Sequence, residues 1–89
     1  MSSQPQNIPP ASFELLVQTL ASQAMVALGI MKNPVTDKID VQPQMAKHFI
    51  DTLEILGTKT KGNLTSEEGK LLEMATHQLR MAYVALPNK

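Results

Sequence analysis

The chain has 89 residues with eight basic and eight acidic side chains, no cysteine, and 43% apolar residues. This length and composition indicate one globular domain and exclude a disordered chain. The balanced charge supplies no overall field that would draw the chain to nucleic acid or to an anionic membrane. Without cysteine there is neither a disulfide framework nor thiolate chemistry, and without a signal peptide we expect a cytoplasmic protein.

The first eleven residues differ from the rest of the chain. Residues 1–11 are polar, contain three of the six prolines and show no apolar periodicity, so we expect a disordered arm. Ser12 is suited to cap the first helix. The domain is therefore expected to span residues 12–86, with residues 87–89 as a short tail.

The first expected helix covers residues 12–31. Its apolar residues recur at spacings of three and four, which places them on one buried face: Phe13, Val17, Leu20, Ala24, Leu28 and Met31. We expect this helix to end near Met31, because Asn33 precedes Pro34 and a residue before proline is pushed out of the helical region.

The second half of this helix is apolar all round, since residues 25–31 contain no polar side chain. A chain this short has little material to cover such a segment, which predicts self-association, most simply as a two-fold homodimer. The uncharged run of residues 15–31 is shorter than the roughly 20 residues of a membrane span and is interrupted by polar side chains, so no span is expected. The residues expected at the self-association interface are Ala21, Ala24, Met25, Val26, Ala27 and Ile30.

A second helix is expected over residues 41–61, with Asp40 as its N-cap and Pro43 in its first turn. Lys47 and Asp51 are spaced to pair on its outer side. Gly62 is expected to end the helix with a positive φ angle. The apolar stripe of this helix is Ala46, Phe49, Ile50, Leu53, Leu56 and Gly57.

A third helix is expected over residues 66–86, ended by Pro87. The spacing of Thr65 and Glu68 fits a capping box. A turn over residues 62–64 would fold the second and third helices into an antiparallel hairpin. We therefore predict an all-α fold of three helices, in which the apolar first helix packs across the hairpin. The buried stripe of the third helix is Leu72, Ala75, Leu79, Ala82, Tyr83 and Leu86.

Several of these segments carry a resemblance: NPVT at 33–36, the start of the second helix with residues 46–47 and 50–51, KTKGNLT at 59–65, and LRMAYV at 79–84. Over residues 13–84 the chain resembles a bacterial family known as domain of unknown function 1844. The chain departs from the family pattern at Asp37, where a glycine is expected, and at Gly69. The resemblance implies a helical fold and a bacterial cytoplasmic setting, and it implies no activity.

Candidate chemistry is sparse in this sequence. His48 and His77 would lie at the same level of the hairpin, near Asp51 and Glu73, but His77 is about 200° from Leu79 around the helix and is expected to point into solvent. No nucleophile has an adjacent base, so we expect neither an enzyme nor a metal or other cofactor.

The hypotheses that remain come from different classes. The first is a non-enzymatic helical interaction or scaffold module that self-associates, with or without a further protein partner. The alternative is a hairpin tip that binds an anionic partner through Lys59, Lys61 and Lys70, with nucleic acid disfavoured because no aromatic side chains accompany these lysines. A metal-dependent enzyme ranks last. The sequence does not indicate the biological process.

Overall fold

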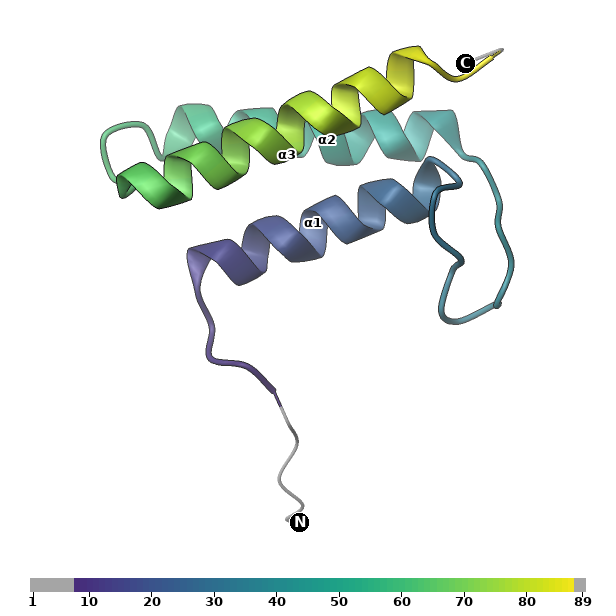
Figure 1. Cartoon of the computed structure of the whole chain (residues 1–89), viewed down its shortest axis with the longest axis horizontal. Coiled ribbons are helices and arrows are strands. Elements are labelled where there is room, and N and C mark those ends of the chain that lie inside the picture. Colours follow the sequence, from purple (N-terminus) through teal and green to yellow (C-terminus); the bar gives the residue numbers. More distant parts are fainter. Residues whose placement is uncertain (1–7, 88–89) are drawn as a thin grey trace.

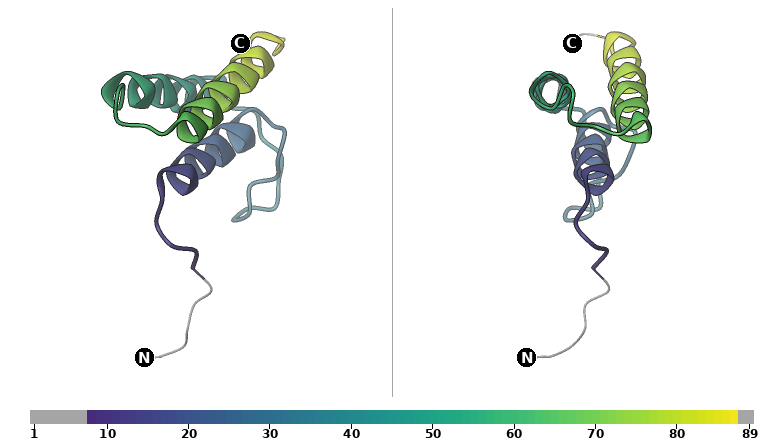
Figure 2. Two further views of the ribbon diagram at one scale, coloured as in Figure 1. Left: turned by 60° about the vertical axis from the view of Figure 1, so that its left-hand side comes forward. Right: turned by 90° about the vertical axis from the view of Figure 1, so that its left-hand side faces the viewer.

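The computed structural model describes residues 8–87, which form three helices and, within that range, no β-strand. The helices are α1 (Phe13–Ala27), α2 (Pro43–Lys59) and α3 (Ser66–Val84), and each packs against the other two. Figure 1 shows α1 and α3 running in one direction along the molecule and α2 in the other. Turned views show α1 below the layer that contains α2 and α3 (Figure 2). The prediction of an all-helical fold with three packed helices is confirmed.

The described residues before α1 add little to this fold. Residues 8–12 have no regular secondary structure, and Ile8 is 72% exposed. The other residues of the expected arm, 1–7, and residues 88–89 of the expected tail lie outside the described part of the chain.

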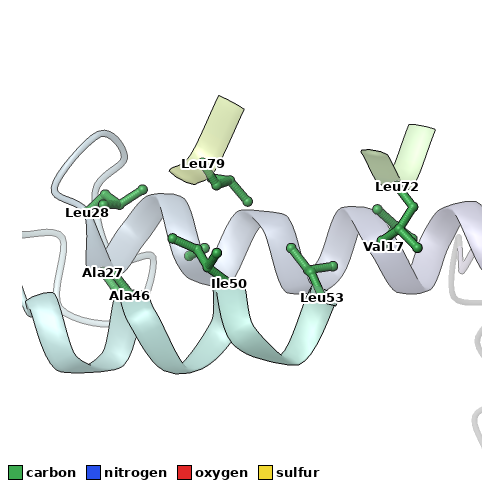
Figure 3. Packing of buried hydrophobic residues seen from close by; sticks show 9 residues of the cluster. Val17, Ala27, Leu28, Ala46, Ile50, Leu53, Leu72 and Leu79 are labelled. Carbon is green, nitrogen blue, oxygen red and sulfur yellow. The ribbon is translucent and has the colours of Figure 1, made fainter. Parts of the chain in front are cut away.

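The core is small and takes side chains from all three helices, as seen in close-up in Figure 3. The predicted stripes meet there: Leu28 follows α1 directly, and Ile50 and Leu53 of α2 are completely buried. Met31 does not join them, because it lies beyond the end of α1 and is 41% exposed. The buried residues are Val17, Ala24, Ala27, Leu28, Ala46, Ile50, Leu53, Leu72 and Leu79.

The end of α1 was predicted wrongly. The helix ends at Ala27 rather than at Met31, because Gly29 takes the left-handed conformation with φ of 80°. The N–H of Ile30 donates to the carbonyl of Met25 at 3.0 Å, and the N–H of Gly29 donates to the carbonyl of Val26 at 3.0 Å. These two bonds form a Schellman motif, so the glycine ends the helix four residues earlier than the Asn33-Pro34 pair would.

The start of α2 also differs from the prediction. Its N-cap is Gln42 and not Asp40, and no side chain caps the helix there. Gln42 precedes Pro43, and the proline ring holds the preceding residue out of the helical region while Pro43 itself is the first helical residue. The backbone N–H of Gln42 instead donates to the carbonyl of Ala27 at 2.7 Å, which joins the start of α2 to the end of α1.

The connection between α2 and α3 is close to the prediction. Thr60 is the C-cap of α2, Gly62 has the expected positive φ of 86°, and Thr65 and Glu68 form the predicted capping box with bonds of 2.9 and 3.1 Å. The predicted C-terminal ends of both helices lie two residues too late in the sequence. Helix α2 ends at Lys59 rather than at residue 61, and α3 ends at Val84 rather than at residue 86.

The loop between α1 and α2 closes on Asn33. The side-chain Oδ1 of Asn33 accepts hydrogen bonds from the N–H groups of Val35 at 2.8 Å and Thr36 at 3.4 Å. Its own N–H donates to the carbonyl of Lys38 at 2.9 Å. The turn leaves Asp37 with φ of 60°, and no other residue except glycine has a positive φ within residues 8–87. The family resemblance leads us to expect glycine at position 37, and the left-handed backbone conformation there is one that favours glycine.

The two left-handed glycines should respond differently to alanine. Both replacements place a side chain in a disfavoured conformation, which costs about 1–2 kcal/mol. A Cβ at Gly29 would also lie 2.6 Å from Cγ2 of Val41, whereas a Cβ at Gly62 would have no neighbour within 4 Å. Denaturant unfolding should therefore show that Gly29→Ala loses more stability than Gly62→Ala, and equal losses would contradict this account.

Asp37→Gly should raise the free energy of unfolding by about 0.5–1 kcal/mol, because it removes the strain of a left-handed aspartate. The ion pair that it removes, Lys32 to Asp37 at 3.8 Å, is too exposed to contribute much. Asp40→Gly is the matched control in the same loop, where φ is not positive, and it should lower stability. Thermal unfolding should therefore show a higher midpoint temperature for Asp37→Gly and a lower one for Asp40→Gly than for the wild type.

Candidate functional site

A groove of about 740 Å³ lies between the C-terminal half of α2 and residues 66–80 of α3. Leu64 from the connecting turn is partly exposed and forms its apolar floor, while Leu53 and Leu72 lie buried beneath it. The charged and titratable side chains that line it are Glu54, Lys61, Lys70, Glu73, His77 and Arg80. It thus combines an apolar floor with a polar rim, an arrangement typical of binding sites.

Glycines produce this hollow. Three of the chain's four glycines, Gly57, Gly62 and Gly69, line the groove. A Cβ at Gly57 would lie 3.3 Å from Cδ2 of Leu72, so this glycine permits α2 and α3 to approach closely. A Cβ at Gly69 would meet no atom within 4 Å, and this residue has no positive φ. The packing of the chain therefore does not require glycine at position 69.

Charged side chains connect α2 to α3 at the end of the groove away from the turn. The guanidinium of Arg80 contacts the carboxylate of Glu54 and lies 3.5 Å from Oδ1 of Asp51. Lys47 Nζ lies 2.7 Å from Oδ2 of Asp51, as predicted from their spacing. The role of Arg80 could not be predicted from the sequence, because its partners lie on another helix and no local spacing connects them.

These contacts shift protonation equilibria. The hydrogen bond from Lys47 lowers the pKa of the Asp51 carboxyl below its ordinary value, and Arg80 lowers it further. The same bond raises the pKa of Lys47. The hydrogen bond to Glu54 raises the pKa of the Arg80 guanidinium, so this side chain stays charged. Arg80 and Glu54 therefore offset each other's charge at the rim of the groove.

The three lysines proposed for an anionic partner are separated by the fold. Lys61 and Lys70 line the groove, whereas Lys59 lies beside Ile55 and Thr58 on a different surface of α2. Within residues 8–87, neither Lys61 nor Lys70 forms an ion pair. The turn end of the groove thus carries two positive charges that this part of the chain does not neutralise.

The two histidines do not share a site. His77 lines the groove, while His48 is exposed on α2 and packs edge-on to the ring of Phe49, with ring centroids 5.3 Å apart. In the described part of the chain, no three histidine, aspartate or glutamate side chains lie together in a way that could hold a metal ion. The four-residue site considered around His48 and His77 is not assembled.

A second candidate surface is the side of α1 that faces away from the core. Of the six residues expected at a self-association interface, Ala24 and Ala27 are buried in the chain's own core, and Ala21 and Met25 pack against it. Val26 is only partly buried and Ile30 is 56% exposed. Of the six, Val26 and Ile30 are the residues that do not pack against the chain's own core. A helix that is apolar all round does not indicate which side its own domain will cover.

Other side chains extend this uncovered surface along α1. Leu15, Thr19, Ser22 and Val26 recur at spacings of three and four, opposite Val17. The hydroxyl of Thr19 donates to the carbonyl of Leu15 at 2.8 Å, which satisfies it within the helix. We call these four residues together with Leu16 and Ile30 the outer α1 face, and none of them carries a charge.

Residues 8–87 thus form a small three-helix fold with a polar-rimmed groove and an uncharged helix face. A family model described as a domain of unknown function, DUF1844, matches residues 10–85, and the chain belongs to this family. No curated protein and no solved structure was found to be similar to it. Among residues 8–87, no helix has the length and apolar character needed to cross a membrane.

Stability should depend on Asp51 at acid pH. Because its pKa is lowered in the folded state, its contribution is present above the unfolded pKa, near 4, and is lost as pH falls through the folded pKa. Denaturant midpoints measured from about pH 5 to pH 2 should therefore fall more steeply for the wild type than for Asp51→Asn. Two parallel curves would show that the carboxylate contributes no such pH dependence.

Proposed function

We propose that this protein is a non-enzymatic helical interaction module that self-associates through the outer α1 face as a two-fold dimer. The α2–α3 pair acts as a hairpin that supports α1 from one side. The bacterial, cytoplasmic setting that the family resemblance implies is part of this proposal. The family is one of unknown function, so membership in it implies no activity.

The observation that carries the proposal is the absence of charge on an accessible helix face. Leu16 is 44% exposed, Val26 does not pack against the core, and Ile30, which follows α1 beyond Gly29, is 56% exposed. Covering this face would bury apolar area, which stabilises a complex by about 25 cal/mol for each Å² removed from water. It would desolvate no ionised group. Association through this face therefore requires neither desolvation of a charged side chain nor the approach of like charges.

A second copy suits this face for two reasons. The face contains no charged residue that would select an oppositely charged partner, and two copies related by a two-fold axis bring the same uncharged surface together without repulsion. Ser22 and Thr19 are also small enough to let two helices approach closely near the middle of α1.

Light scattering should report a mass above the 9.8 kDa of one chain at micromolar concentration. Val26→Glu combined with Ile30→Glu should shift the protein to the monomer, because two carboxylates would then be buried opposite their copies in the dimer. Helical circular dichroism of this variant should stay unchanged, since neither side chain belongs to the core.

Ile55→Glu is the matched control. Ile55 is 59% exposed, close to the exposure of Ile30, but lies on α2 outside the outer α1 face. This control should keep the wild-type mass. A wild-type mass of 9.8 kDa throughout the concentration range would overturn the proposal, and so would dissociation by Ile55→Glu alone.

A further inference from the structure

We propose that the groove between α2 and α3 binds a short acidic and apolar peptide segment of a partner protein. The segment would place an apolar side chain against the groove floor and a carboxylate at the turn end. This surface lies on different helices from the outer α1 face, so peptide binding does not depend on the proposed dimer.

The charges along the groove give the segment its direction. Lys61, in the connecting turn after α2, and Lys70, one turn into α3, carry positive charges that form no ion pair within residues 8–87. Further from the turn, Glu54 is paired with Arg80 and Glu73 adds a negative charge. A carboxylate would be attracted at the turn end and repelled near Glu73, which favours one orientation of the segment.

The floor selects for an apolar side chain. Leu64, which is partly exposed, lines the groove above the buried Leu53 and Leu72, and Gly69 leaves open the space beside it. Glycine inside a helix costs about 1 kcal/mol relative to alanine, and neither backbone conformation nor packing within the chain calls for it at this position. A glycine also allows another molecule to approach the backbone closely, and such an approach would explain the glycine at position 69.

The composition of the groove favours a peptide over nucleic acid. None of the described residues that line it is aromatic, so they offer no platform on which bases could stack. Two free lysines accompanied by Glu73 also give a weak field for a phosphate backbone. An apolar floor with a charged rim matches the way in which amphipathic peptides are bound in grooves.

The proposal is tested by selecting displayed random peptides on the full chain. Enriched sequences should combine leucine, isoleucine, methionine or phenylalanine with aspartate or glutamate. One enriched peptide, made synthetically, should bind at least about tenfold more weakly to Gly69→Leu, which fills the groove, and to Lys61→Glu combined with Lys70→Glu. Gly69→Leu should unfold at the wild-type temperature or above, since its Cβ meets no atom within 4 Å.

Matched controls exclude general effects of the substitutions. Gln78→Leu adds the same side chain to an exposed position of α3 outside the groove, and Lys59→Glu reverses a charge outside it. Both should bind the peptide like the wild type. The monomeric variant Val26→Glu with Ile30→Glu should also bind, which separates this proposal from that of the dimer.

Three results would overturn the proposal. The first is that no peptide is enriched, or that the enriched peptides are basic. The second is that the selected peptide binds Gly69→Leu as tightly as the wild type. The third is that a single-stranded oligonucleotide competes with the peptide and depends on Lys61 and Lys70 more strongly than the peptide does, which would assign the groove to nucleic acid.

Discussion

The hydrogen bond from the Gln42 N–H to the Ala27 carbonyl, 2.7 Å long, is the contact on which the arrangement of the helices depends. It connects the last residue of α1 to the residue that starts α2, and its ends lie beside the small side chains of Ala27 and Ala46, which are shown close together in Figure 3. Gly29 reverses the chain so that Val41 can lie against its backbone. Because large side chains would hold these backbones apart, the glycine and the alanines permit α1 and α2 to pack closely, and α3 completes the core over both.

Three helices of this length cover one another on one side only. The core contains nine buried residues, so α1 keeps an uncharged outer side, and α2 and α3 keep a groove where their glycines remove side-chain volume. These two surfaces have different chemistry. The outer α1 face has no charge and suits an identical surface, whereas the groove combines an apolar floor with two unneutralised lysines and suits a partner of opposite charge.

The proposed dimer and the proposed peptide site are compatible with each other. The outer α1 face and the groove share no residue, and the groove is built from α2, α3 and their connecting turn alone. A two-fold dimer through α1 would therefore carry two grooves, and a partner with two acidic segments could bind both at once. Such bivalent binding strengthens association without any new contact, provided that the linker between the segments spans the two sites.

Local chemistry in the sequence determined the helices, the Thr65–Glu68 capping box, the positive φ of Gly62 and most of the buried stripe, because each of these depends on residues within one or two turns. The sequence did not show that α1 ends at Ala27, just before Gly29, since a glycine in an apolar run can continue a helix as well as end it. Only the tertiary structure brought Arg80 to Glu54 and Asp51 and placed Lys61 and Lys70, but not Lys59, along one groove. It also decided that Ala24 and Ala27 are buried while Val26 and Ile30 are not, because which side of an all-apolar segment is covered depends on where the other helices lie.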